Sequence, residues 1–220
     1  TPSLASTESI KHILDSIKDK FSFKEAEITL EMNPNDVSRD KIDKLLMAGI
    51  NRISLGIQSY NNQELQALGR NHDKESAIRA TQALEGVNST IDLIYGIEKQ
   101  TPKSFTANLE RIIQSNINHL SLYQLTIEPN TIFYKKELKL PSEEEIEKME
   151  LIAKNLLEKN GYKQYEVSSW SKPGYESQHN MNYWQFGDFL GVGPGSHSKI
   201  SNKEGIIRFR KIKPLEGYIQ

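Results

Sequence analysis

The stretch Thr90-Ile91-Asp92-Leu93-Ile94-Tyr95-Gly96 is a short, mostly apolar run that ends at a glycine. A run of this length and composition is typical of a strand buried on both faces of a parallel sheet. Similar runs lie on both sides of it, at residues 27–33, 52–59 and 119–126. Helical patterns occupy the intervals between them, at residues 38–49, 61–68, 74–85 and 102–115. Strand–helix alternation at this spacing predicts βαβ units and a parallel sheet.

The fold class is therefore expected to be α/β, with part of a (β/α) barrel or an open doubly wound sheet. A helix at residues 7–20 precedes this region, capped by Ser6 or Thr7. After residue 130 the pattern changes: a basic loop leads to a highly charged helix at 142–160, whose Ser142 and Glu145 form a capping box. A further strand is expected at 162–169.

In both folds, binding sites lie at the carboxyl ends of the strands. The polar residues there are Glu31, Asn33, Gln58, Asp92, Gln124 and Thr126. We expect these side chains to lie close together at the carboxyl ends of the strands. Asp92 is the most informative of them, because a carboxylate inside an apolar strand needs a partner or a ligand. The alternative is a paired structural aspartate that is hydrogen-bonded to the loop of a neighbouring strand.

Composition excludes several classes of function. The 220 residues carry a formal net charge of −1, which gives no electrostatic reason for a nucleic-acid partner. No apolar run approaches the roughly 18 residues of a membrane helix, and we expect a cytoplasmic protein. The chain has no cysteine, which excludes disulfides, thiolate catalysis and thiolate-bound zinc or iron–sulfur clusters within these residues.

The stretch His179-Asn180-Met181-Asn182-Tyr183-Trp184 combines a histidine with two aromatic residues, and a turn with Gly191, Gly193 and Gly195 follows it. A histidine beside aromatic faces can bind haem, because imidazole supplies an axial ligand and the rings supply a stacking surface. The alternative is a structural histidine at the end of a strand, with Tyr183 and Trp184 in a core. The stretch is expected to be a strand or a loop.

Taken together, these motifs resemble the radical SAM family that includes oxygen-independent coproporphyrinogen III oxidases and the HemW haem chaperones. The matching stretches are Thr1-Pro2-Ser3-Leu4, residues 27–34, residues 52–59 with Arg70, residues 91–96 with Gln100-Thr101-Pro102, and residues 123–129. Each stretch alone is weakly specific, but the stretches together, in this order and at this spacing, are strongly specific. They cover nearly the whole chain. The 179–184 motif is similar to the HemW signature and is not typical of the oxidases.

The resemblance implies the site residues. Those that fall where the family contacts S-adenosylmethionine (SAM) are Thr1, Glu31, Gln58, Arg70, Asp92, Thr126 and His197. Carboxylates suit the ammonium and ribose hydroxyls of SAM, and Arg70 suits its carboxylate. His179 is the implied haem ligand. The cofactors implied are therefore SAM, a [4Fe–4S] cluster and haem. The family's Cys-x-x-x-Cys-x-x-Cys cluster motif is absent, so these residues provide no ligands for the cluster, and whether the chain is an enzyme stays open.

The leading hypothesis is a central piece of a HemW-like haem chaperone, which holds haem and passes it to an apoprotein. A dimer is compatible with this role, and membrane association is expected only through the acceptor. One alternative is an oxygen-independent coproporphyrinogen oxidase, and another is an inactive remnant of a split gene. Residues 1–130 would form a partial radical SAM barrel, and residues 131–220 a small α+β extension with the 179–184 motif and the glycine-rich turn.

Overall fold

The computed structural model describes residues 2–131, 133–136 and 138–219. These residues form two compact units that divide between residues 176 and 177, which we call the sheet unit and the C-terminal unit. Thr1, one of the expected SAM contacts, lies outside the described residues.

The sheet unit alternates strands with helices along the chain. Its strands are β1 (Thr29–Met32), β2 (Arg52–Gln58), β3 (Ser89–Tyr95), β4 (His119–Gln124), β5 (Lys163–Gln164) and β6 (Ser169–Ser171). Its α-helices are α1 (Thr7–Lys18), α2 (Arg39–Ala48), α3 (Asn62–Ala67), α4 (Lys74–Ala83), α5 (Pro102–Gln114) and α6 (Glu143–Lys159). Short 3₁₀ helices lie at Pro2–Leu4, Pro34–Asp36 and Tyr134–Lys136.

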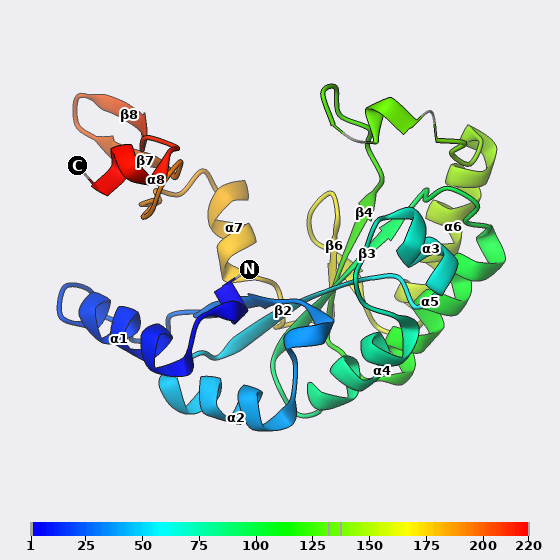
Figure 1. Cartoon of the computed structure of the whole chain (residues 1–220), viewed down its shortest axis with the longest axis horizontal. Helices are drawn as coiled ribbons and strands as arrows, with labels where there is room; N and C mark the ends of the chain where they lie inside the picture. Colours follow the sequence, from blue (N-terminus) through cyan, green and yellow to red (C-terminus); the bar gives the residue numbers. More distant parts are fainter. Residues whose placement is uncertain (1, 132, 137, 220) are drawn as a thin grey trace. The chain divides into compact units, whose positions relative to one another are not determined.

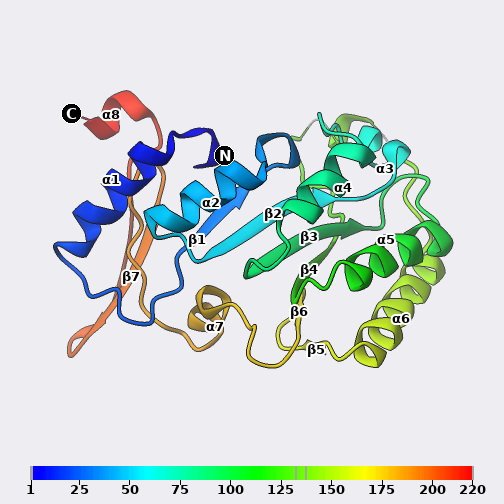
Figure 2. The ribbon, with the colours of Figure 1, turned by 90° about the horizontal axis from the view of Figure 1, so that it is seen from below.

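The strands form one sheet of order β1-β2-β3-β4-β6-β5. The first four are parallel, and β6 is antiparallel to both β4 and β5. The described strands do not close into a barrel. Figures 1 and 2 show α2, α4, α5 and α6 along one side of this curved sheet, and none of these helices of the sheet unit covers its other face. The expected α/β fold with a partial, mainly parallel barrel is confirmed.

Local sequence signals define the helix ends. Ser38 caps α2 by accepting a hydrogen bond from Lys41 N, and Gly49 ends that helix with a left-handed φ of 112°. The capping box expected at α6 is present, with Ser142 and Glu145 bonding each other's backbone N–H groups. At α1 the cap is Ser6, which accepts from Ser9 N.

The core lies between the sheet and the helices that cover it. Its strand residues include Ile53, Leu55, Ile91, Leu93, Leu120 and Leu122, all buried. The helices contribute residues such as Leu45, Leu109 and Leu157. Because side chains alternate along a strand, the residues between these positions point to the uncovered face.

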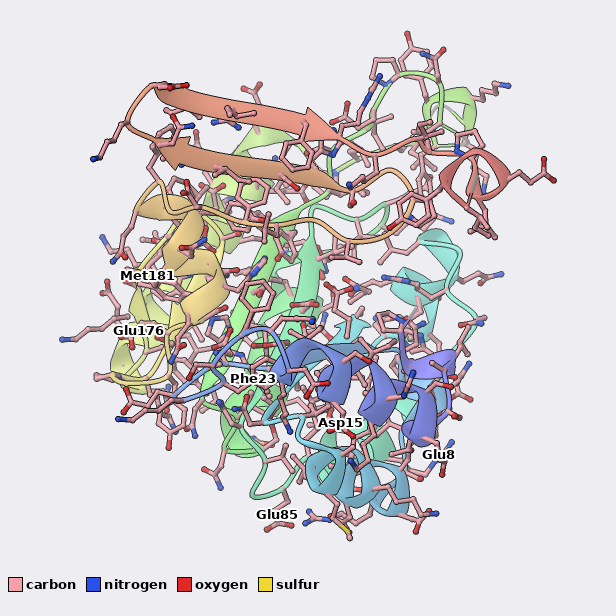
Figure 3. The ribbon with its side chains drawn as sticks, turned by 90° about the vertical axis from the view of Figure 1, so that its left-hand side faces the viewer. Glu8, Asp15, Phe23, Glu85, Glu176 and Met181 are labelled. Atoms are coloured by element: carbon pink, nitrogen blue, oxygen red, sulfur yellow. The ribbon has the colours of Figure 1, made fainter. Side chains whose placement is uncertain are left out.

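The C-terminal unit is small and mixed. It contains α7 (Gln178–Trp184), an antiparallel hairpin of β7 (His197–Asn202) and β8 (Gly205–Arg210), and α8 (Leu215–Ile219). Phe189 forms an isolated bridge to Lys199 and so adds one residue pair to the free edge of β7. Figure 3 shows the two paired strands of the hairpin, with Met181 marking α7.

Several local predictions were wrong. The 179–184 stretch is a helix, not a strand or loop, because Ser177 caps it by accepting from Asn180 N. The strand expected at 162–169 is two short antiparallel strands, β5 and β6, with residues 165–168 between them. The third parallel strand, β3, was expected to be buried on both faces; its residues up to Ile91 and Leu93 are buried, but Asp92, Ile94 and Tyr95 are only half-buried.

The two compact units divide at residue 176, whereas the boundary drawn from resemblance lies at residue 130. The physical reason is that α6 packs on α5 and β6 pairs with β4, which joins residues 143–171 to the sheet. The family boundary after residue 130 stays a prediction.

Candidate functional site

The uncovered face of the sheet is polar. Alternate residues of three neighbouring strands point to it: Arg52 and Ser54, Thr90 and Asp92, His119 and Ser121. The register places Thr90 beside Ser54 and His119, and it places Asp92 beside Ser121. The polar groups therefore form two layers, one nearer the amino ends of the strands and one nearer the carboxyl ends.

Most polar groups of the lower layer have partners among the described residues, but His119 Nδ1 is buried without one. The guanidinium of Arg52 pairs with Glu27 at 2.9 Å and donates to Thr90 Oγ1 at 2.7 and 3.2 Å. His119 Nε2 lies 2.7 Å from the hydroxyl of Tyr165. Burial, and next the charge of Arg52, lowers the pKa of His119 to about 3. The lower layer is thus a buried polar layer, made of a neutral histidine and a paired arginine, beneath Asp92.

The upper layer centres on a carboxylate that is held in an unfavourable environment. Ser54 Oγ donates to Asp92 Oδ2 at 3.2 Å. Burial raises the pKa of Asp92 to about 6, although hydrogen bonds from Ser121 and Ser54 act in the opposite direction. The structural alternative is met only in part, since Asp92 has partners on both neighbouring strands, Ser54 and Ser121, and these lie within the strands and not in a loop. These partners do not compensate for the loss of water around the carboxylate.

Two other expected residues lie within electrostatic reach of Asp92. The negative charge of Glu31, on β1, raises the pKa of Asp92 further. Desolvation lowers the pKa of Arg70, and the charge of Asp92 acts against that shift. Glu31, Arg70 and Asp92 come from three separate segments, and the fold brings them into one charged cluster.

Gln58 ends β2 in an unusual conformation. Its φ is +67°, and the β2–β3 register shifts between Leu55 and Gln58. A bulge of this kind redirects the side chains that follow it and is frequent beside functional sites. The buried Gln58 side chain folds back over Gly56, where an added Cβ would lie 3.0 Å from Gln58 Nε2. Glycine at position 56 thus leaves the space that the redirected amide uses.

Thr126 follows β4 by two residues and lines an open cavity of about 810 Å³. Tyr123 and Trp170 line the same cavity, together with Glu150 of α6. Glu150 accepts a hydrogen bond of 2.9 Å from the hydroxyl of Tyr95. Among the described residues, the hydroxyl of Thr126 donates to Gln124 O at 3.5 Å, and no hydrogen bond joins it to Glu31, Arg70 or Asp92.

The buried carboxyl group of Glu64 connects the loops that follow β2 and β3. Glu64 Oε2 accepts from Ser59 Oγ at 2.5 Å, Asn108 Nδ2 at 3.0 Å and Gln100 Nε2 at 3.1 Å. Its other oxygen accepts from Ser104 Oγ at 2.7 Å. The same Gln100 side chain accepts from Gly96 N at 2.8 Å. Through Glu64, the segments after β2 and β3 are tied to each other and to α5.

His179 and His197 lie in the C-terminal unit. His179 is exposed on α7, and the edge of its ring meets the Tyr183 ring at a centroid distance of 4.8 Å and an angle of 79°. The Tyr183 ring in turn lies 4.9 Å from the ring of Phe189. Tyr183 and Trp184 are 46% and 58% exposed, so the alternative in which they fill a core is wrong. His197 begins β7 opposite Arg210 and is also exposed.

Hydrogen bonds fix the segment between α7 and β7. Asn182 accepts from Gly187 N through its backbone carbonyl at 2.7 Å and donates to Asp188 O through its side chain at 3.1 Å. A Cβ at Gly187 would collide with Asn182. Asn182, which is one of the two unspecified positions of the His-Asn-x-x-Tyr-Trp motif, therefore has a structural role in this turn.

Lys199 also contacts the segment between α7 and β7. Its buried ammonium donates to Phe186 O at 2.8 Å, Asp188 Oδ1 at 2.9 Å and Ser201 Oγ at 3.2 Å. The backbone N–H of Ser201, followed by Lys199, lowers the pKa of Asp188 to about 2. Residues 186–188 are thus held rigidly against β7.

Sequence reasoning missed the serines beside Asp92, the lower polar layer around Arg52 and the buried Glu64. A signal for the first two was present, because residues 119–124, His-Leu-Ser-Leu-Tyr-Gln, alternate polar and apolar side chains. No comparable signal marked Glu64, whose partners are spread from residue 59 to residue 108.

A family model described as the radical SAM superfamily matches residues 2–112, which is half of the chain. The chain belongs to the radical SAM superfamily. Over its whole length it is 42% identical to "Heme chaperone HemW" of Buchnera aphidicola subsp. Acyrthosiphon pisum and 39% identical to the protein of that name from Escherichia coli K12. The chain spans 59% and 60%, respectively, of the length of these two relatives.

The solved structure of Escherichia coli coproporphyrinogen III oxidase, described as a radical SAM enzyme, superimposes on this radical SAM chain with a TM-score of 0.80. The match covers 98% of this chain and 53% of the oxidase at 24% sequence identity. At that identity the likeness concerns the fold, and it agrees with the partial barrel described above.

The superfamily implies SAM and a [4Fe–4S] cluster, and the two fit these residues differently. Iron–sulfur clusters bind to cysteine thiolates, and none of the 220 residues is a cysteine. The described residues also contain no group of three or more His, Asp or Glu side chains placed to hold a metal ion. SAM has an ammonium and a carboxylate, which suit the carboxylates and the arginine of the charged cluster.

Proposed function

We propose that this chain is part of a haem chaperone of the HemW type, which binds haem and transfers it to an apoprotein. The observation that carries the proposal is similarity over the whole chain to proteins named as haem chaperones. The exposed imidazole of His179 supports it. Its ring lies against Tyr183, which is itself backed by Phe189, and a fixed ring is a better axial ligand than a mobile one.

Replacing His179 with alanine is expected to weaken haem binding by about tenfold or more and to shift the Soret band, because the axial ligand is lost. Haem titration of the purified chain, followed by absorbance, measures both effects. His12→Ala is the matched control, since His12 is also an exposed histidine on a helix. Identical titrations of the wild type and His179→Ala would contradict the role of His179.

We also propose that the carboxyl edge of the sheet binds SAM. In this proposal Glu31 and Asp92 face its ammonium and ribose, and Arg70 faces its carboxylate. Gln58, Thr126, Thr1 and His197 complete the site as the resemblance implies. The raised pKa of Asp92 supports the proposal, because a carboxylate that lacks compensation in the free protein gains it from a bound cation.

SAM is accordingly expected to raise the melting temperature of the wild type and to leave that of Asp92→Asn unchanged, because the amide cannot pair with the ammonium. Thermal denaturation with increasing SAM measures this. S-adenosylhomocysteine is a useful second ligand, since it keeps the ammonium and carboxylate but lacks the sulfonium charge. An equal shift in the wild type and the variant would show that Asp92 does not contact SAM.

The partners follow from the same proposal. They are haem, or another porphyrin, and an apoprotein that accepts the haem. A dimer and membrane contact through the acceptor alone are part of the proposal, as are a cytoplasmic location and the absence of a nucleic-acid partner. None of the described helices is long and apolar enough to cross a membrane.

A further inference from the structure

Phe186, two residues beyond the 179–184 motif, presents its ring to solvent in a strained conformation. Its backbone φ is +60°, a region that bulky side chains rarely adopt, and the side chain is 58% exposed. The neighbouring Gly187 and Asp188 are fixed by Asn182 and Lys199, so the conformation is imposed by the surrounding contacts. A strained aromatic residue with an exposed face suggests a functional constraint.

Two cations flank this ring. Lys199 Nζ lies 4.1 Å from the ring centroid, and the guanidinium carbon of Arg208 lies 5.9 Å from it. Lys199 is buried and already donates to Asp188 and to backbone carbonyls. Arg208 lies on the exposed strand β8 and forms no ion pair with any described residue. Arg208 is therefore the cation that remains available to an anion.

Arg208 and the aromatic rings share one face of the hairpin. Lys199 pairs with Arg208 on one side and with Phe189 on the other, and residues opposite each other in antiparallel strands point to the same face. Phe189 contacts Tyr183, which contacts His179. Two sets of contacts thus meet at Lys199: the rings of His179, Tyr183 and Phe189, whose last member pairs with Lys199, and the ring of Phe186, which Lys199 and Arg208 flank.

We propose that Phe186 and Arg208 extend the haem site beyond the 179–184 motif: Phe186 stacks on the porphyrin, and Arg208 binds a propionate. This inference rests on the proposed haem function. Haem joins a flat apolar ring system to two carboxylates at one edge, and the aromatic rings and the guanidinium are the complementary groups. Guanidinium binds carboxylate through two parallel hydrogen bonds, and stacking on an aromatic ring orients it for this contact.

The test compares haem with haem dimethyl ester, in which both carboxylates are masked, in the same detergent. Arg208→Gln is expected to weaken binding of free haem by about fivefold and to leave ester binding unchanged. The Soret band should keep its position, because the axial ligand is untouched. Lys211→Gln is the matched control, since Lys211 also stacks on an aromatic ring, Phe209 at 5.5 Å, on the opposite face of the hairpin.

The outcomes separate this inference from the proposed function. Equal affinity of the wild type and Arg208→Gln for haem, with binding still lost in His179→Ala, would overturn the role of Arg208 alone. An equal loss in Arg208→Gln and Lys211→Gln would also overturn it, because any cation on the hairpin would then suffice. Absence of haem binding by the wild type would overturn the proposed haem function and this inference together.

Discussion

Asp92→Asn is expected to raise the free energy of unfolding by about 3 kcal/mol at pH 8. The pKa of Asp92 rises from 3.8 to about 6 on folding, so at pH 8 the folded protein holds an ionised carboxylate in a place that disfavours it. Asparagine keeps the shape and can bond Ser54 and Ser121 without carrying the charge. Urea unfolding at pH 8 measures the difference.

Asp19→Asn is the control, because Asp19 is an exposed residue at the end of α1. It should change stability by no more than about 0.5 kcal/mol. A destabilised Asp92→Asn would mean that the serine hydrogen bonds outweigh the burial of the charge. The expected gain in stability, combined with loss of the SAM response, would mark Asp92 as a residue retained for binding.

The pH dependence gives a second measurement of the same groups. Since the folded pKa of Asp92 is raised, its contribution to stability is present below pH 3.8 and is lost as the pH rises through about 6. His119 acts in the opposite sense. Its folded pKa is lowered from 6.5 to about 3, so its contribution is present above pH 6.5 and is lost as the pH falls toward 3.

Between pH 8 and pH 4.5 the two groups should nearly cancel. His119 removes about 3 kcal/mol over that range, and Asp92 restores about 2 kcal/mol. Asp92→Asn should therefore become much less stable in acid, whereas His119→Gln should become more stable. Urea unfolding of both variants at the two pH values tests this, and parallel slopes in the two variants would contradict it.

Glu64→Ala is expected to lower the free energy of unfolding by about 4 kcal/mol. The carboxyl group of Glu64 accepts four hydrogen bonds, and its removal leaves the buried side chains of Ser59, Gln100 and Asn108 without that acceptor. It also opens a cavity next to α5. Chemical denaturation at pH 7.5 measures the loss.

Glu64→Gln should lose about half as much, because one of its two oxygens remains while an added donor faces existing donors. Gln66→Ala, at an exposed position of α3, should have almost no effect. A loss below about 1 kcal/mol in Glu64→Ala would show that water replaces the carboxyl group. In that case the loops after β2 and β3 would not depend on Glu64.

The sequence predicted the strand–helix order because periodicity and caps are local signals. The helix at 142–160, with Ser142 and Glu145, differs from α6 only at its ends. Periodicity failed at 179–184, because a seven-residue helix is too short to show a period and its cap, Ser177, lies outside the motif. Local signals also cannot decide whether a sheet closes.

The site was predictable in part for a similar reason. The strand-end rule selects Glu31 and Asp92, and the fold does bring them together with Arg70. The rule cannot supply the energetics. The charge of Asp92 is only partly compensated by Ser54 and Ser121. These serines lie 38 residues before it and 29 residues after it, and only the sheet register places them beside it. Phe186 was missed because backbone strain has no signature in composition.

The order of the parallel strands, β1-β2-β3-β4, is also their order along the chain. During synthesis, each strand after β1 therefore leaves the ribosome after the neighbouring strand with which it pairs. About 30 residues separate β2 from β3, which corresponds to a delay of about 2 to 6 seconds during synthesis. In that interval the apolar side of β2 has only the helices made so far to cover it. Translation speed between these strands, and the chaperones that meet them, should thus influence how much of the protein reaches its native state.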